Sequence, residues 1–169
     1  FQIVGAIDMD PNKAGKKLCE VLNIHEDEEN HVIITKDYNK ILKKNFADVF
    51  VLATSSFTKS VFPFIKLAAE AGMNVVTTAE EMSYPKALDK ELSEEMDKIA
   101  KENNVSILGT GVNPGFIMDY VVIMLTGVCD SVENIKVSRV NDLSCFGKAV
   151  MEEQGIGLKK EDFIKGVNN

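Results

Sequence analysis

Short apolar runs that alternate with segments of helical character constrain this chain more than any other feature of its sequence. Turn residues bound the runs, and apolar side chains recur at helical spacing between them. We expect strands in 1–7, 31–35, 47–53, 74–78 and 105–108, and helices in 13–22, 38–44, 58–71 and 85–103. Strands and helices in this alternation predict a parallel sheet with right-handed crossovers, that is, an α/β fold.

The pattern changes after residue 108. A loop rich in glycine at 109–115 leads into an apolar segment at 116–127, for which we expect a helix. The partial alternation of 132–143 predicts a longer strand. We therefore predict one domain in residues 1–112 and the start of a second, α+β domain in 113–169. The first strand is already under way at Phe1, so we expect sequence beyond both ends of the chain.

Composition and charge exclude several classes of function. The net charge of −7 over 169 residues argues against nucleic acids and anionic membranes, which require clustered Lys and Arg. Every apolar run is well short of the roughly 20 residues that a membrane-spanning helix needs. The three cysteines are scattered, which indicates a reducing, cytoplasmic location and neither a disulfide framework nor a metal site.

Asp8 comes directly after the first apolar run. Ligands of open parallel sheets bind beyond the carboxyl ends of the strands, and in dinucleotide-binding folds an acid at this place accepts hydrogen bonds from the adenosine ribose. A carboxylate repels a 2′-phosphate, and no Arg follows Asp8, which favours NAD over NADP. The alternative is a turn aspartate before Pro11. The glycine-rich phosphate turn would precede Phe1.

Polar residues also follow the third and fourth apolar runs. The small residues of 53–56 (ATSS) would let a cofactor approach the backbone, or Ser56 or Thr58 could cap the next helix. Glu80 and Glu81 follow the fourth run, where either could be a base or could bind an ammonium group. The alternative is two solvated acids that the dipole of the next helix favours.

The loop 109–116 (GTGVNPGF) follows the fifth run and begins a helix. Asn113 can cap that helix with Pro114 at its first position, so that free N–H groups face an anion. Asp119 interrupts the apolar helix, either as a ligand for a substrate ammonium or as a solvent-facing residue. Alternatively, the glycines form a GxGxxxG phosphate loop with Asp142, although Asp142 lies beyond the usual spacing of about 20 residues.

Several of these blocks together resemble the 2,4-diaminopentanoate dehydrogenases, relatives of dihydrodipicolinate reductase. They occur in the same order over residues 1–160: IVGAID at 3–8, DPNKAG at 10–15, ATSS at 53–56, VTTAEE at 76–81 and GTGVNPGF at 109–116. The resemblance implies a Rossmann-like dinucleotide-binding domain in 1–112 and a substrate and dimerisation domain from 113. It also implies NAD(P)-dependent oxidative deamination of 2,4-diaminopentanoate to 2-amino-4-oxopentanoate and ammonia, in ornithine degradation, by a homodimer.

The resemblance also implies roles for individual residues. Asp8 would hold the adenosine ribose, and the cofactor would contact Ala53, Thr54, Ser55, Thr78 and Ala79. Glu80, Asn113 and Asp119 are the candidates for catalysis and for binding a diamino-acid substrate. Without the glycine turn we expect the chain by itself to be inactive. The alternatives are an imine reductase like dihydrodipicolinate reductase, whose His-His and Lys pattern is not visible here, and a non-catalytic nucleotide-binding module.

Overall fold

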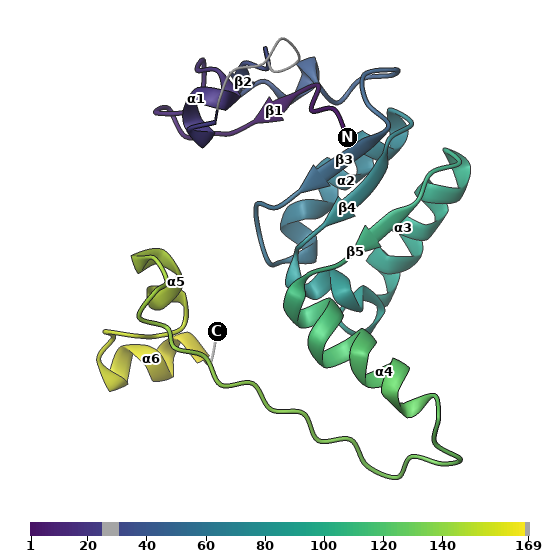
Figure 1. Cartoon of the computed structure of the whole chain (residues 1–169), viewed down its shortest axis with the longest axis vertical. Coiled ribbons are helices and arrows are strands. Elements are labelled where there is room, and N and C mark those ends of the chain that lie inside the picture. The colour runs from purple at the N-terminus through teal and green to yellow at the C-terminus, as the bar shows by residue number, and fades with distance from the viewer. Residues whose placement is uncertain (25–30, 168–169) are drawn as a thin grey trace. The chain divides into compact units, whose positions relative to one another are not determined.

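The computed structural model of the chain describes residues 1–24 and 31–167. It divides into two compact units, residues 1–130 and residues 131–169 (Figure 1). Parallel strands alternate with helices in the first unit, which confirms the predicted α/β fold. The predicted boundary between domains at residue 112 stays a prediction, because a compact unit of the chain need not coincide with a functional domain.

The strands of the first unit form two parallel sheets. The smaller sheet pairs β1 (Ala6–Ile7) with β2 (Ile34–Thr35), with α1 (Leu18–Leu22) between them in the chain. The larger sheet has the order β3-β4-β5, and its strands are β3 (Val49–Leu52), β4 (Asn74–Thr77) and β5 (Ile107–Gly109). The predicted strands 1–7 and 31–35 are therefore much longer than the paired segments. A segment forms a strand only where the backbone of a neighbouring strand pairs with it. The side chains of Ile3 and Val4, in the unpaired part of the first run, are exposed.

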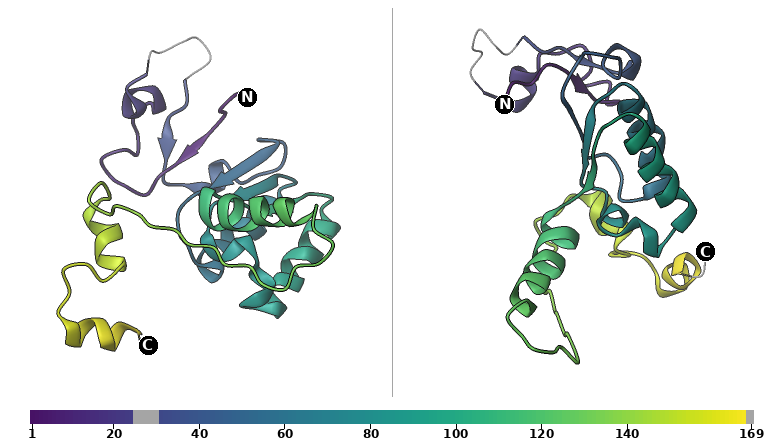
Figure 2. Two further views of the ribbon diagram at one scale, coloured as in Figure 1. Left: turned by 60° about the horizontal axis from the view of Figure 1, so that its bottom comes forward. Right: turned by 90° about the vertical axis from the view of Figure 1, so that its right-hand side faces the viewer.

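Two helices cover one face of the larger sheet. Helix α2 (Thr58–Glu70) contacts β4, and α3 (Lys90–Glu102) contacts β5 and α2 (Figure 2). The core lies between these layers, where α2 places Val61, Ile65 and Ala68 at helical spacing, all fully buried. Burial of an Ile or Val side chain stabilises a fold by roughly 1.5–3 kcal/mol. This packing fixes the larger sheet, and with it the loops at its carboxyl edge.

The ends of these two helices follow local side-chain chemistry. Gly72, at φ +84°, directly follows the last turn of α2 and donates its N–H to the Ala69 carbonyl, as predicted from its position in the sequence. The helix predicted in 85–103 is divided into a 3₁₀ turn, η3 (Pro85–Ala87), and α3. Asp89 causes the division, because its extended backbone ends the 3₁₀ turn and its carboxylate accepts the N–H of Leu92 as the cap of α3.

Short 3₁₀ turns and one irregular helix complete the first unit. The helix predicted in 38–44 is only a 3₁₀ turn, η1 (Tyr38–Lys40), which Asp37 caps. The turn η2 (Glu80–Ser83) follows β4. After β5, the segment η4 (Val112–Tyr120) has non-helical backbone at Asn113, Pro114 and Gly115 and then continues into α4 (Val121–Thr126).

The second unit contains two short helices, α5 (Lys148–Glu153) and α6 (Lys160–Val167). The strand predicted in 132–143 is wrong: this stretch has no strand partner among the residues that the structure describes (Figure 1). Its apolar side chains, such as Ile135 and Val140, are exposed. Alternating apolar residues give a strand only when a neighbouring strand takes up the backbone hydrogen bonds. Within the described ranges, every helix is too short or too polar to cross a lipid bilayer.

Candidate functional site

The carboxyl ends of β3, β4 and β5 form one aligned edge of the larger sheet. Leu52 is paired with Thr77, and Thr77 with Gly109, so the three strands end at the same level. The register continues one residue further, because the N–H of Thr78 donates to the Leu52 carbonyl and the N–H of Thr110 to the Thr77 carbonyl. The loops that begin at residues 53, 78 and 110 are therefore neighbours. Ligands of parallel sheets bind at such an edge.

Apart from Asp8, the residues predicted to contact the cofactor lie along this edge, but they are not equally accessible. Ala53, Thr54 and Thr78 are exposed, and Ser55 is half-buried with its hydroxyl accepting the N–H of Phe57. Ala79 is only 2% exposed and packs in the core. The side chain of Ala79 therefore cannot touch a ligand here, and a contact at this position would have to come from its backbone.

Glu81 links the segment after β4 to the start of α2. Its carboxylate Oε2 accepts the N–H of Thr58 at 2.7 Å, and its own N–H donates to the Ser56 carbonyl. A carboxylate at this place satisfies a free N–H group and interacts favourably with the helix dipole. The expectation that Ser56 or Thr58 caps α2 is wrong, because Phe57 holds the cap position and Glu81 supplies the acceptor.

Glu80 differs from its neighbour Glu81 in its surroundings. Its side chain is exposed, and its carbonyl accepts the hydroxyl of Ser83 at 2.9 Å. The two acids after β4 thus separate into one that holds the loops together and one that faces solvent at the carboxyl edge. Of the two, Glu80 is the carboxylate that an incoming amine could reach.

The loop after β5 packs tightly against the segment after β4. A side chain at Gly109 would overlap the backbone carbonyl of Met82, so only glycine fits there. Gly115 has φ +123°, a conformation that favours glycine. The N–H of Phe116, directly after Gly115, donates to the Gly111 carbonyl. The GTGVNPGF block is therefore a compact turn whose glycines serve close packing and backbone conformation.

The start of the following helix differs from the prediction in its cap. Asn113 has an extended backbone and does not cap the helix, because the non-helical residues continue to Gly115. Asp119 instead accepts the N–H of Gly115 through Oδ2 at 2.7 Å. The helix start therefore presents fewer free N–H groups to a ligand than we expected. Asp119 is exposed and holds this turn, and its pairing with a residue four positions earlier was not foreseen from its place in an apolar run.

Asp8 directly follows β1, in the smaller sheet. Its Oδ1 accepts the N–H of Asp10 at 2.9 Å, and its Oδ2 accepts the ammonium of Lys13 at 2.7 Å. The hydrogen bond from Lys13, and next the one from Asp10, hold the pKa of the Asp8 carboxyl below its ordinary value, and Asp8 raises the pKa of the Lys13 amine. Sequence reasoning missed Lys13, although a cation five residues after the acid, across the Pro11 turn, was a visible signal.

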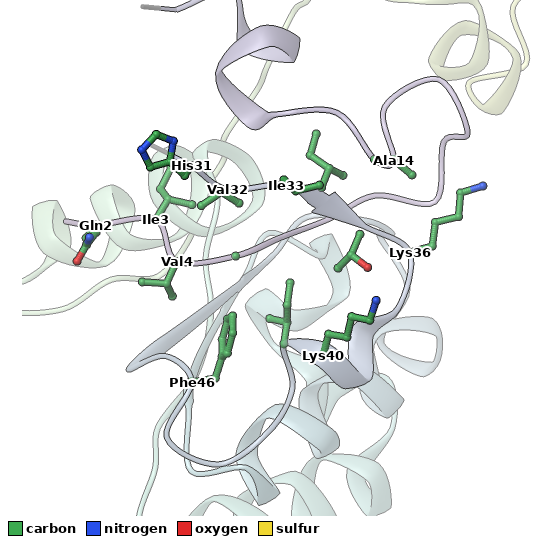
Figure 3. A pocket seen from close by; sticks show the side chains of 15 residues that line it. Gln2, Ile3, Val4, Ala14, His31, Val32, Ile33, Lys36, Lys40 and Phe46 are labelled. Atoms are coloured by element: carbon green, nitrogen blue, oxygen red, sulfur yellow. The ribbon is translucent and has the colours of Figure 1, made fainter. Parts of the chain in front are cut away.

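A cavity of about 750 Å³ lies beside the smaller sheet, away from the carboxyl edge (Figure 3). Its lining comes from 2–5, 14–15, 31–36, 40–41 and Phe46, with Phe46 on one side and Lys36 and Lys40 together at one end. The predicted site residues are not among the described residues that line it. The cavity is therefore distinct from the strand ends, where the predicted site residues lie.

The comparisons with known proteins identify relatives of two kinds. Residues 116–169 match the family model described as the 2,4-diaminopentanoate dehydrogenase C-terminal domain. Over 135 residues, 80% of this chain and 38% of the relative, the chain is 52% identical to a protein named 2,4-diaminopentanoate dehydrogenase from Acetoanaerobium sticklandii. Among solved structures it is similar to an amine dehydrogenase from Mycobacterium smegmatis, with a TM-score of 0.68 and 31% identity, over 78% of this chain and 38% of that one. The chain thus spans well under half the length of either relative.

Proposed function

Because this chain is a relative of the 2,4-diaminopentanoate dehydrogenases, we propose that it forms the nucleotide-binding part, and the start of the substrate part, of an NAD(P)-dependent dehydrogenase. The identity of 52% over 135 residues carries this proposal, since those residues amount to most of the chain. The parallel strands with one aligned carboxyl edge support it.

The proposed reaction is the oxidative deamination of 2,4-diaminopentanoate to 2-amino-4-oxopentanoate and ammonia, as a step of ornithine degradation in the cytoplasm. When bound, the nicotinamide would supply the hydride acceptor for the amine-bearing carbon of the substrate, and hydrolysis of the oxidised carbon–nitrogen bond would release ammonia. The protein has to orient the amine-bearing carbon and hold the substrate's ammonium and carboxylate groups. The dimer that the resemblance implies is part of the same proposal.

The accessible residues at the strand ends suit the cofactor part of this role. Asp8 retains lone pairs on both carboxylate oxygens and can accept the ribose hydroxyls. Ala53, Thr54 and Thr78 are small and exposed, which lets a flat ring approach the sheet edge. The negative charge of Asp8 favours NAD, whose ribose carries no 2′-phosphate.

In this proposal, residues of the loops after β4 and β5 bind the substrate. Glu80 is an exposed carboxylate that can attract the substrate's ammonium group or accept a proton from it. Asp119 already holds the N–H of Gly115, so its second oxygen is the one available to an amine. Asn113 lies in the same loop, half-buried, as the candidate to contact the substrate's polar groups.

An assay of the full-length protein tests the proposed function. Mixed with NAD and 2,4-diaminopentanoate, the protein should produce NADH, which is followed by its near-ultraviolet absorbance. Parallel assays with dihydrodipicolinate and NADH, and a titration with NADH alone, address the other two functions. Turnover of the cyclic imine only would identify an imine reductase. Binding of NADH with no turnover of either substrate would indicate a non-catalytic nucleotide-binding module, and both results would contradict the proposal.

A further inference from the structure

The turn that follows β1 brings the ammonium of Lys13 into contact with Asp8, the acid predicted to bind the adenosine ribose. The carbonyl of Asp10 accepts the N–H groups of Lys13 and Ala14, and the side chain of Asp10 accepts the N–H of Asn12. These hydrogen bonds fold residues 8–14 back on themselves. The Lys13 ammonium consequently reaches Oδ2 of Asp8 at 2.7 Å.

This pairing changes the charge that a nucleotide would meet at the end of β1. Asp8 alone presents one negative charge, whereas the pair presents a carboxylate and an ammonium side by side. Both groups are partly open to solvent, with 34% of the Asp8 side chain and 44% of the Lys13 side chain exposed. The lysine stem is flexible and its ammonium carries three donors, so Lys13 can turn from one anion to another nearby.

We propose that Lys13 is a cofactor-specificity residue, whose ammonium binds the 2′-phosphate of NADP and thereby lets this site accept NADP as well as NAD. The inference rests on the proposed function, in which Asp8 lies next to the adenosine ribose. With NAD bound, Lys13 keeps its contact with Asp8, and the carboxylate accepts a ribose hydroxyl. With NADP bound, Lys13 also neutralises the added phosphate, which Asp8 alone would repel.

The proposal predicts an effect of the Lys13 charge that depends on the 2′-phosphate and on nothing else in the nucleotide. Two pairs of probes isolate that group: 2′,5′-ADP against 5′-AMP, and NADPH against NADH. Calorimetric titration of the full-length protein gives the Kd of each. In Lys13→Met, which keeps the apolar stem, the 2′-phosphorylated probes should bind roughly tenfold more weakly, as expected for the loss of a charge-assisted hydrogen bond. The unphosphorylated probes should change much less.

Two further variants control the charge and the side-chain chemistry. Lys16→Met removes the same charge from an exposed lysine three residues away, and it should leave the ratio of the two Kd values unchanged. Lys13→Arg should retain the binding of the 2′-phosphate, because it keeps the cation. Salt should weaken the selectivity of the unmodified protein, since screening reduces attraction between partly exposed charges.

Each result supports the inference or overturns it. Equal losses for both members of a probe pair in Lys13→Met, or the same selective loss in Lys16→Met, would overturn it and leave Lys13 a structural partner of Asp8. Should Lys13→Met not fold, Lys13→Gln replaces it as the test: it also removes the cation, and the same selective weakening of the 2′-phosphorylated probes is expected. If the unmodified protein binds none of the four nucleotides, the proposed function itself fails.

Discussion

The pair of Asp8 and Lys13 stabilises the turn after β1 over a defined range of pH. The lowered pKa of Asp8 means that its contribution is present above its ordinary pKa and is lost as the pH falls through the lowered value. The raised pKa of Lys13 means that its contribution is present below its ordinary pKa and is lost as the pH rises through the raised value. The ion pair is therefore complete from about pH 5 to about pH 9.

Removal of the lysine should change the titration of the acid. In Lys13→Met the pKa of Asp8 should rise towards its ordinary value, because its strongest hydrogen-bond donor is lost while the Asp10 N–H remains. The measurement is the carboxyl carbon chemical shift of Asp8, followed by NMR over acidic pH in the full-length protein. Lys16→Met is the matched control. An unchanged Asp8 titration in Lys13→Met would show that the two side chains are not paired in solution.

At the level of single residues, the sequence predicted where a side chain lies in the fold better than it predicted the side chain's hydrogen-bond or ion-pair partner. Asp8 was placed correctly after β1 because it ends an apolar run. Its contact with Lys13, the contact of Asp119 with Gly115 and the pairing of Glu81 with Thr58 were not foreseen. Each depends on the path of an irregular turn or on packing between distant segments, which residue spacing does not encode. The roles of the site residues in binding and catalysis stay predictions.

Among the elements, α2 depends on an acceptor from another part of the chain. We expect Glu81→Ala to lower the free energy of unfolding by about 1 kcal/mol, typical of the loss of a helix cap. Chemical denaturation of the full-length protein measures this change. Glu80→Ala removes the same charge from the exposed neighbour and should cost much less. Equal effects of the two substitutions would show that the contact of Glu81 with Thr58 does not stabilise α2.

The larger sheet and its two helices were predictable, since burial gives their sequences clear periodicity. Strands β3 and β4 lie within the predicted runs, and α2 begins at the predicted residue. The failures have physical causes of two kinds. Asp89 offers the backbone a cap that apolar spacing does not reveal, and the strand expected in 132–143 would require a neighbour that the described chain does not supply. Strand formation depends on pairing as much as on pattern.

Over the whole molecule, protection of backbone amides against hydrogen exchange should differ between segments that pair in a sheet and segments that do not. In the chain of residues 1–169, amide hydrogens of β4, which is paired on both sides, should exchange with solvent far more slowly than those of 132–143. Hydrogen exchange followed by mass spectrometry makes the comparison within one sample. Comparable protection of the two segments would mean that 132–143 is paired with another strand, and the sequence-based prediction would then be right.

Met82 and Gly109 touch through bare main chain, so the connections leaving β4 and β5 are joined where no rotamer change can relieve a mismatch. A shift of either connection must carry the other with it. A substitution that changes the path of one connection therefore has to be matched by a change in the other. A redesign of these loops should therefore exchange the two connections together and keep Gly109 unchanged.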